Sequence, residues 1–311
     1  MLKTFDNILD RTIIFSFSNI GFKIRKKIFR WDNSHYKNFS GKTIAITGPT
    51  SGIGKAVAIE LAESGANLIL LARNRSKLDA LEDQLKPTFG NHKSILVDLS
   101  DLSSVRQAAA HLRKLEQLDI IIHNAGGLHN QRQVTNDGIE LTLQTHVVAP
   151  HLINTIVLEN ATLSKGTKII SIASGGMYSQ KVDLSDLGSE KDYKGSKAYA
   201  RAKRIQIDLT SLWAKKEPQI NFYALHPGWV DTPGLKHSLP KFYKIINKFL
   251  RNTSQGIDTM LWLCGTEPDQ LNSGAFYHDR AVRSTQFFPK TDTTEKDKQI
   301  LWQEIKKLSE H

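Results

Sequence analysis

The sequence predicts an α/β protein in which a doubly wound parallel sheet of about seven strands has helices on both faces. Short apolar, β-branched runs alternate along residues 41–280 with segments of helical periodicity. A glycine-rich turn follows the first of these runs, and polar residues follow most of the others. Because strands that alternate with helices pair in parallel through right-handed crossovers, we expect one such sheet in a single domain.

The order of these elements is regular up to residue 280. Strands are predicted over residues 42–47, 67–72, 93–97, 118–123, 167–173, 220–225 and 274–277. Helices are predicted over residues 55–64, 76–85, 102–115, 138–160, 196–216 and 255–264, with a basic, amphipathic helical region over 235–251. Pro150 is expected to kink the helix over 138–160, since proline cannot donate a backbone hydrogen bond. Neither an internal repeat nor a low-complexity linker divides the chain.

Residues 1–40 form an N-terminal arm of different composition, and residues 281–311 form a C-terminal extension. Apolar side chains from Phe5 to Ile28 recur in the arm at roughly helical spacing, beside a basic cluster. The cluster consists of Lys23, Arg25, Lys26, Lys27 and Arg30. Two interpretations stay open. The amphipathic arm can lie peripherally on an anionic membrane surface, or it can pack against its own domain or a partner subunit.

The composition excludes several classes of protein. The 311 residues carry a formal net charge of +11, which favours an anionic partner such as a polyphosphate cofactor. No zinc-ligand spacing and no RNA-binding motif is present, so we expect neither a metal site nor a nucleic-acid partner. The single cysteine, Cys264, indicates a reducing compartment. No apolar run approaches the ~20 residues of a membrane span, and no signal peptide is evident, so a cytoplasmic protein is expected.

The first predicted strand leads into a turn that is suited to binding a phosphate. Glycines stand at positions 48, 52 and 54, between the strand and the next helix. Glycines there let the backbone approach a pyrophosphate at a helix N-terminus, so the sequence predicts a dinucleotide site. The residues assigned to it are Gly48, Thr50, Ser51, Gly52, Ile53 and Gly54. An ordinary turn with C-cap glycines is the structural alternative.

Two further strand ends bear on the identity of the cofactor. Arg73 follows the second strand, where an acidic residue would bind a ribose 2′-hydroxyl and repel a 2′-phosphate. A guanidinium pairs with that phosphate instead, so NADP(H) is favoured over NAD(H); a solvated surface arginine is the alternative. Asp98 and Leu99 follow the third strand. The Asp98 carboxylate can meet the adenine amino group there, or it can form a helix cap or an Asx turn.

Tyr199 and Lys203 stand four residues apart in a predicted helix and therefore lie on one face of it. A cationic neighbour favours an ionised phenol, so Lys203 would move the pKa of Tyr199 from about 10 toward neutral pH. The pair alone is weak evidence, because an exposed lysine packed on an aromatic ring has the same spacing. The polar residues that follow the other strands strengthen the interpretation of Tyr199 and Lys203 as a functional pair.

Five motifs together resemble those of the short-chain dehydrogenase/reductase (SDR) family. They are Thr47–Gly54, Asn124-Ala125-Gly126 after the fourth strand, Ser174 after the fifth, Tyr199-x-x-x-Lys203, and Pro227-Gly228 with Thr232 after the sixth. Their order and their places at strand ends make the resemblance specific over residues 41–280, and it implies a Rossmann-type fold. Four segments, 174–177, 226–234, 255–262 and 273–276, narrow it to one branch of the family, whose substrates are poorly defined.

The resemblance implies an NADP(H)-dependent oxidoreductase that interconverts a ketone or aldehyde with an alcohol. Tyr199 would be the general acid in reduction and the general base in oxidation. Lys203 would lower the pKa of Tyr199 and bond the nicotinamide ribose. Ser174 would hydrogen-bond the substrate oxygen; Ser171, three residues earlier in the strand, is the less favoured rival.

The remaining motif residues are cofactor contacts that the resemblance implies. Asn124 would tie strands together behind the cofactor, with a plain turn residue as its alternative. Thr232 and the backbone near Val230 would meet the nicotinamide carboxamide. The other implied contacts are Ala125, Gly126, Pro227 and Gly228, together with Tyr199 and Lys203.

One position departs from the family pattern. Most members have an asparagine in the helix after the fourth strand, where it helps a water relay protons from the lysine, and here the matching residue is His146. Its imidazole can relay a proton itself, can block the water, or can be a buried side chain bonded to a nearby carbonyl. The sequence leaves these three interpretations open. This departure motivates a second hypothesis, that of a catalytically idle NADP(H)-binding or regulatory protein.

Residues 235–252 follow the cofactor loop and are expected to cover the substrate. An apolar stripe that includes Leu239, Phe242 and Phe249 runs beside a basic one. As a lid, this region favours a lipophilic small-molecule substrate and can touch a membrane surface; as a surface helix, it only packs its apolar face on the domain. Many SDR members pair through the helices that hold His146 and Tyr199, so a homo-oligomer is one expectation, and Pro150 and the basic surface can alter that pairing.

Overall fold

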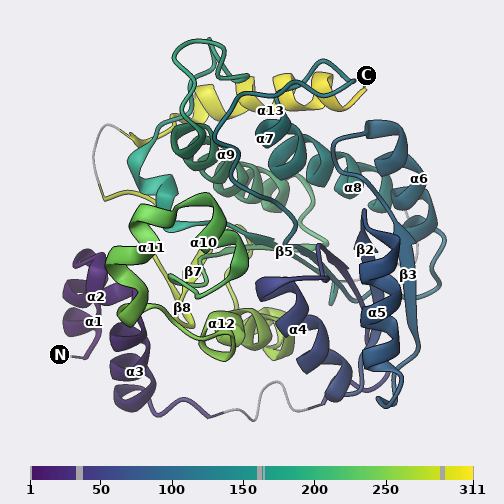
Figure 1. Cartoon of the computed structure of the whole chain (residues 1–311), viewed down its shortest axis with the longest axis horizontal. Coiled ribbons are helices and arrows are strands. Elements are labelled where there is room, and N and C mark those ends of the chain that lie inside the picture. Colours follow the sequence, from purple (N-terminus) through teal and green to yellow (C-terminus); the bar gives the residue numbers. More distant parts are fainter. Residues whose placement is uncertain (1, 33–37, 160–162, 164, 288–290, 311) are drawn as a thin grey trace.

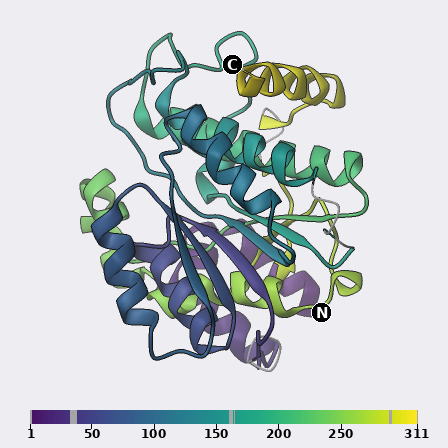
Figure 2. The same ribbon diagram turned by 90° about the vertical axis from the view of Figure 1, so that its right-hand side faces the viewer.

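A computed structural model describes residues 2–32, 38–159, 163, 165–287 and 291–310. One twisted sheet lies between two layers of helices (Figure 1, Figure 2). Its strands are β1 Thr43–Thr47, β2 Asn67–Ala72, β3 His92–Leu96, β4 Ile120–His123, β5 Lys168–Ile172, β6 Asn221–Leu225, β7 Phe276–His278 and β8 Ala281–Val282, in the spatial order β3-β2-β1-β4-β5-β6-β7-β8. The strands from β3 to β7 pair in parallel, and β8 pairs with β7 antiparallel. The predicted doubly wound sheet is confirmed, with β8 added as an edge strand.

Alternation along the strands divides the core between the two faces of the sheet. One face is covered by α6 Leu102–Arg113, α8 Ala149–Val157 and α9 Gly195–Lys216, and the other by α4 Gly52–Glu63, α5 Arg75–Leu85 and α12 Thr253–Gly265. In β1, Ala45 packs in the first of these cores, and its neighbours Ile44 and Ile46 pack in the second. Since both faces are buried, the strands read as continuous apolar runs in the sequence.

The predicted helix over 138–160 is divided into three parts, and residue 160 lies outside the described residues. The parts are α7 Leu141–Leu143, the π-helical segment η2 Gln144–Val148, and α8. Pro150 is in the first turn of α8, where a missing N–H is tolerated. The carbonyl four residues before a proline has no α-helical donor, so the irregularity falls in η2 rather than as a kink at Pro150 itself.

The basic helical region over 235–251 is also divided. It contains α10 Pro233–Ser238, α11 Pro240–Ile246 and the short 3₁₀ segment η4 Asn247–Phe249. Leu239, between the two α-helices, has φ −132° and ψ 61°, which is outside the helical range. The residue before a proline is biased away from helix, and Pro240 therefore breaks the region into two short helices joined by a bend.

The N-terminal arm packs against the β7–β8 edge of its own domain (Figure 1). It contains α1 Leu2–Arg11, α2 Ile14–Phe17 and α3 Asn19–Ile28. Phe17 and Phe22 are buried, at 3% and 4% exposure. Residues 33–37 of the predicted arm lie outside the described residues. Of the helices that the structure does describe, none is both long enough and apolar enough to cross a membrane.

A buried ionic network holds the arm in place. Arg25 donates to Asp6 of the arm at 2.7 Å and to Asp279, in the turn between β7 and β8, at 2.8 Å. Asp279 also pairs with Arg251 at 2.6 Å, and Arg283 pairs with Asp6 at 2.7 Å. Arg25 belongs to the basic cluster of the arm, yet it is 1% exposed. Its charge is therefore paired with buried carboxylates and does not contribute to the basic surface of the arm.

The C-terminal extension ends in α13 Glu295–Glu310, which lies across α8 and α9 (Figure 1). The Trp302 ring contacts Trp213 of α9 at a centroid distance of 4.7 Å and His151 of α8 at 5.0 Å. Leu301 and Ile305 are fully buried in the same core. The extension therefore completes one face of the domain.

Candidate active site

The carboxyl ends of β1 to β6 surround one large cavity of about 950 Å³. Ligands of doubly wound sheets bind at this edge. The cavity is lined by every residue that the sequence assigned to the site, namely Gly48, Thr50, Ser51, Gly52, Ile53, Gly54, Arg73, Asp98, Leu99, Asn124, Ala125, Gly126, His146, Ser174, Tyr199, Lys203, Pro227, Gly228, Val230 and Thr232. Ser171, the rival of Ser174, instead lines a separate cavity of about 20 Å³.

The glycine-rich turn has the shape that a dinucleotide requires. Gly48 has φ 66°, and a side chain on Gly54 would meet the Gly48 oxygen at 2.2 Å and the Asn124 amide nitrogen at 2.3 Å. That amide donates to the carbonyls of Thr47 and Gly48, at 3.0 Å and 3.1 Å, and so ties the ends of β1 and β4 together. Ser51, at the N-cap of α4, makes no side-chain cap, so the helix N-terminus is open toward an anion. These features fit a pyrophosphate.

Basic side chains line the end of the cavity near β2. Arg73 is exposed there, and so is Lys77 of α5, which the sequence analysis missed although it lies one turn further on. Asp98 uses one carboxylate oxygen in an Asx turn, where Oδ1 accepts from the backbone and the hydroxyl of Ser100 at 2.9 Å and 2.6 Å. The positive charge at this end is therefore carried by Arg73 and Lys77.

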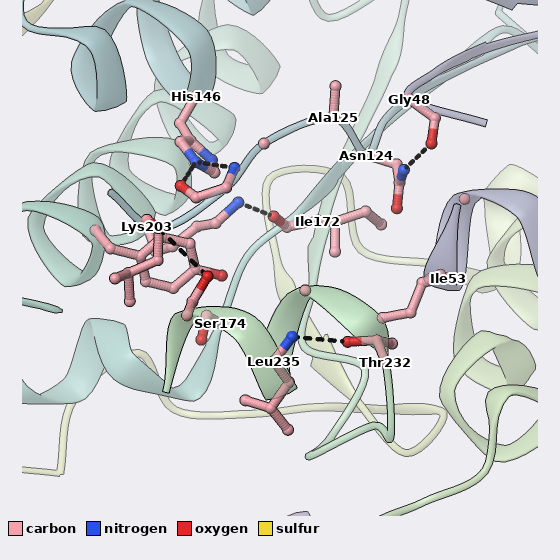
Figure 3. Close-up of a pocket in the computed structure, with 18 of the residues that line it drawn as sticks. Gly48, Ile53, Asn124, Ala125, His146, Ile172, Ser174, Lys203, Thr232 and Leu235 are labelled. Carbon is pink, nitrogen blue, oxygen red and sulfur yellow. Dashed lines mark hydrogen bonds between the residues drawn. The ribbon is translucent and has the colours of Figure 1, made fainter. Parts of the chain in front are cut away.

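Ser174 and Lys203 lie close together in the cavity (Figure 3), and Tyr199 lines it beside them. Ser174 follows β5, while Tyr199 and Lys203 lie one turn apart on α9. Burial raises the pKa of Tyr199, and a hydrogen bond with Ser174 opposes that rise. Lys203 Nζ donates to the Ile172 carbonyl at 2.6 Å and lies 5.5 Å from the centre of the Tyr199 ring. Burial lowers the pKa of Lys203 from 10.5 to about 7.

His146 lies beside Tyr199, with the two rings edge to face at 5.3 Å. Its Nε2 is 2.9 Å from the carbonyl oxygen of Gly127 and 3.1 Å from the backbone nitrogen of the same residue. Burial, and next the charge of Lys203, hold the pKa of His146 well below its usual value. His146 is thus a neutral, 1% exposed imidazole that is bonded to the backbone after β4.

The other end of the cavity is apolar, and part of its wall comes from the N-terminal arm. Ile13 and Phe17 line this end together with Trp229, Leu235, Leu239 and Phe242. The Phe17 carbonyl accepts from the Trp229 N–H at 2.8 Å, and the Phe17 ring packs on His226 at 4.4 Å. No sequence pattern indicates this role, because Trp229 and His226 lie more than 200 residues from Phe17 in the chain. Among the described residues, no group of three or more potential metal ligands is gathered.

A doubly wound sheet with a glycine-rich turn after its first strand is typical of dinucleotide-binding oxidoreductases, and this fold and cavity place the chain in that class. Residues 42–241 also match the family of the short chain dehydrogenases. The chain belongs to this family, whose members are NAD(P)-dependent oxidoreductases with a Rossmann-type fold.

Curated relatives support the same assignment. Dehydrogenase/reductase SDR family member 12 of Homo sapiens is 34% identical over 249 residues, which are 79% of this chain and 78% of that protein. The four segments named above indicated this branch of the family, so that prediction is confirmed. Retinol dehydrogenase 12 of Homo sapiens is 30% identical over 246 residues, which are 77% of this chain and 78% of that protein.

Solved structures share the fold. The Pseudomonas aeruginosa RhlG/NADP active-site complex has a TM-score of 0.63 and 21% identity, covering 78% of this chain and 95% of that one. A short-chain dehydrogenase from Sphingobium yanoikuyae in complex with NADPH has a TM-score of 0.58 and 22% identity, covering 71% and 82%. At these identities the similarity shows the fold alone.

The low pKa of Lys203 makes stability depend on pH. Between about pH 7 and 10.5, the unfolded chain holds a proton on Lys203 that the folded protein has lost, so stability rises with pH across this window. Lys203→Met removes this titration. We expect the free energy of unfolding of the wild type, relative to Lys203→Met, to rise by roughly 4 kcal/mol over the window. Urea denaturation at a series of pH values measures this, and a flat difference would contradict it.

Proposed function

We propose that the protein is an NADP(H)-dependent oxidoreductase that interconverts a lipophilic ketone or aldehyde with an alcohol. The observation that carries this proposal is the place of Ser174, Tyr199 and Lys203 within the cavity. Ser174 follows β5, which lies in the sheet between β1, with its glycine-rich turn, and β6, whose following loop holds Trp229 of the apolar end. Tyr199 and Lys203 line the cavity with it. A cofactor that reaches from the basic end and a substrate that occupies the apolar end would meet at these three side chains.

The chemistry assigns a role to each of the three. NADPH, when bound, supplies a hydride to the carbonyl carbon. The Ser174 hydroxyl holds the carbonyl oxygen, and the Tyr199 phenol donates a proton to that oxygen as negative charge develops on it. Lys203, in its protonated form, favours the ionised phenol and so eases this proton transfer. In the oxidation direction, Tyr199 accepts the proton from the alcohol.

The apolar end of the cavity supports a lipophilic substrate. The arm and the α10–α11 region supply apolar walls there, and few charged groups face them. Ser238 of α10 donates to the Leu128 carbonyl at 3.3 Å, and both residues line the cavity, which supports a lid role for this region. The name of the relative retinol dehydrogenase 12 refers to an alcohol of this character.

The first test is substrate turnover with Tyr199→Phe, which keeps the ring and removes the proton donor. We expect NADPH consumption with lipophilic aldehydes and ketones to fall by at least about 100-fold, because positioned acid–base groups contribute that much or more. Binding of NADPH, measured by fluorescence, should stay within about twofold of the wild type, because the ring itself is kept.

Tyr193→Phe is the matched control, since the Tyr193 hydroxyl bonds the His129 carbonyl at 3.0 Å and the residue does not line the cavity. It should keep full activity. If the wild type binds NADPH but turns over no compound of the panel, the result contradicts the proposal and favours the second hypothesis, an idle NADP(H)-binding or regulatory protein. His146 motivates that alternative.

The preference for NADP(H) over NAD(H) is part of the proposal and rests on Arg73 and Lys77. The similar structures named for NADP and NADPH support it. Arg73→Ala should weaken NADPH binding by about 10- to 100-fold and leave NADH binding unchanged, because only NADPH has a 2′-phosphate to pair with the guanidinium. Isothermal titration calorimetry with both nucleotides measures this.

The control for the cofactor experiment is Arg75→Ala. Arg75 is also exposed, two residues further on, but it does not line the cavity. Its loss should change neither affinity. An equal loss of NADPH and NADH affinity in Arg73→Ala would show that the guanidinium does not read the 2′-phosphate.

We also propose that the outer face of α1 and α2 binds an anionic bilayer peripherally. Five apolar side chains are exposed there: Leu2 57%, Phe5 45%, Ile8 61%, Ile14 59% and Phe15 52%. The neighbouring α3 carries exposed Lys23, Lys26 and Lys27, which are suited to anionic headgroups. Ile13, between these apolar residues, lines the substrate end of the cavity. A lipophilic substrate would thus enter near the membrane.

Vesicle flotation tests this surface. The double variant Phe5→Ser with Ile8→Ser should bind phosphatidylserine-containing vesicles at least about tenfold more weakly than the wild type, because each inserted side chain contributes about 1.5 kcal/mol or more. Phe89→Ser, which changes a 102% exposed residue in another part of the chain, should bind as the wild type does. Wild-type protein that stays unbound, or that self-associates through this face, would exclude the bilayer.

A further inference from the structure

Gln206 connects Lys203 to a different part of the chain. It lies one turn beyond Lys203 on α9 and is 6% exposed. Its side-chain oxygen accepts from Lys203 Nζ at 2.9 Å, and its side-chain nitrogen donates to the His146 carbonyl at 2.8 Å. One amide therefore bridges the lysine of the proposed site and the π-helical segment η2. None of the sequence motifs includes this residue.

Pro150 removes the α-helical donor of the His146 carbonyl. In an α-helix, the carbonyl would accept from the N–H four residues on, and that residue is Pro150, which has no N–H. Gln206 donates to this buried carbonyl at the place where Pro150 removes the α-helical donor. Since the nitrogen end of the amide must face this carbonyl, the oxygen end must face Lys203.

Lys203 is thereby held by two fixed acceptors. Its amine can donate three hydrogen bonds, of which the Ile172 carbonyl takes one at 2.6 Å and Gln206 takes another. The third is directed by these two. The titratable side chains that face the amine are Tyr199 on its own helix and His146 on η2.

We infer that Gln206 is a positioning residue, whose amide holds the Lys203 amine in place for Tyr199 and fills the space between that amine and the His146 carbonyl. The inference rests on the function proposed above. Both contacts of the amide are direct, so the amide itself links Lys203 to the His146 carbonyl, and an amide does not titrate. Lys203 therefore exchanges its proton on the side of the cavity and not through η2.

The experiment follows the titration of Lys203 in the full chain by NMR of ¹³C-labelled lysine, with the signal assigned through Lys203→Arg. The wild-type amine should titrate near its expected pKa of about 7. The Gln206 oxygen is a strong acceptor that stabilises the ammonium form of Lys203. Gln206→Met keeps the length of the side chain but removes this acceptor, so the pKa of Lys203 should fall by about one pH unit. Gln206→Glu places a carboxylate there and should raise the pKa by about as much or more.

Thr210→Val is the control variant on the same helix. The Thr210 hydroxyl bonds the backbone carbonyl of Gln206 at 2.7 Å and does not touch Lys203, so its loss should leave the titration unchanged. The inference is overturned if neither Gln206→Met nor Gln206→Glu changes the pKa of Lys203, or if both variants shift that pKa in the same direction. If Gln206→Met does not fold, the rise in the pKa of Lys203 that is expected in Gln206→Glu still tests the inference. No substrate is needed, so a protein without turnover would refute the proposed reaction and leave this test intact.

Discussion

One buried carboxylate, that of Asp279, connects three parts of the chain that are far apart in sequence. It pairs with Arg25 at 2.8 Å and with Arg251 at 2.6 Å, and each of the three residues is at most 2% exposed. Burial by itself would raise the pKa of Asp279, but Arg251, His278 and Arg25 together hold that pKa far below its usual range. Removing one member of such a buried set costs about 3–5 kcal/mol, because a charge is then left unpaired. The position of the arm depends on this set.

Arg251 extends this support to the active site. Its backbone N–H donates to the Trp229 carbonyl at 2.7 Å, and its own carbonyl accepts from Asp231 at 2.8 Å. The same stretch contains Val230 and Thr232, which line the cavity where the cofactor is expected. Phe17, on the arm, bonds this stretch through the Trp229 N–H at 2.8 Å. The arm, which forms part of the apolar wall of the cavity, and the loop after β6 are therefore both held by the Asp279–Arg251 pair. The arm and the loop are far apart in the sequence.

The sheet and the cavity could be predicted because their signals are local. Parallel strands end at the same edge, so the residues after β1, β4 and β5 had to come together; Ser174 lines the cavity because it follows β5, whereas Ser171 lies within that strand. The arm could not be predicted in this way. Arg25 reads as part of an exposed basic cluster, and its partner Asp279 is 254 residues further on. The contact of Gln206 likewise depends on a carbonyl 60 residues away.

The C-terminal helix α13 has a consequence for assembly. Its Trp302 and Ile305 pack with side chains of α8 and α9 in one apolar core. The part of these helices beneath α13 is thus covered by the chain itself. Helix α13 gives α8 and α9 an apolar cover from within the chain, which no second copy has to supply.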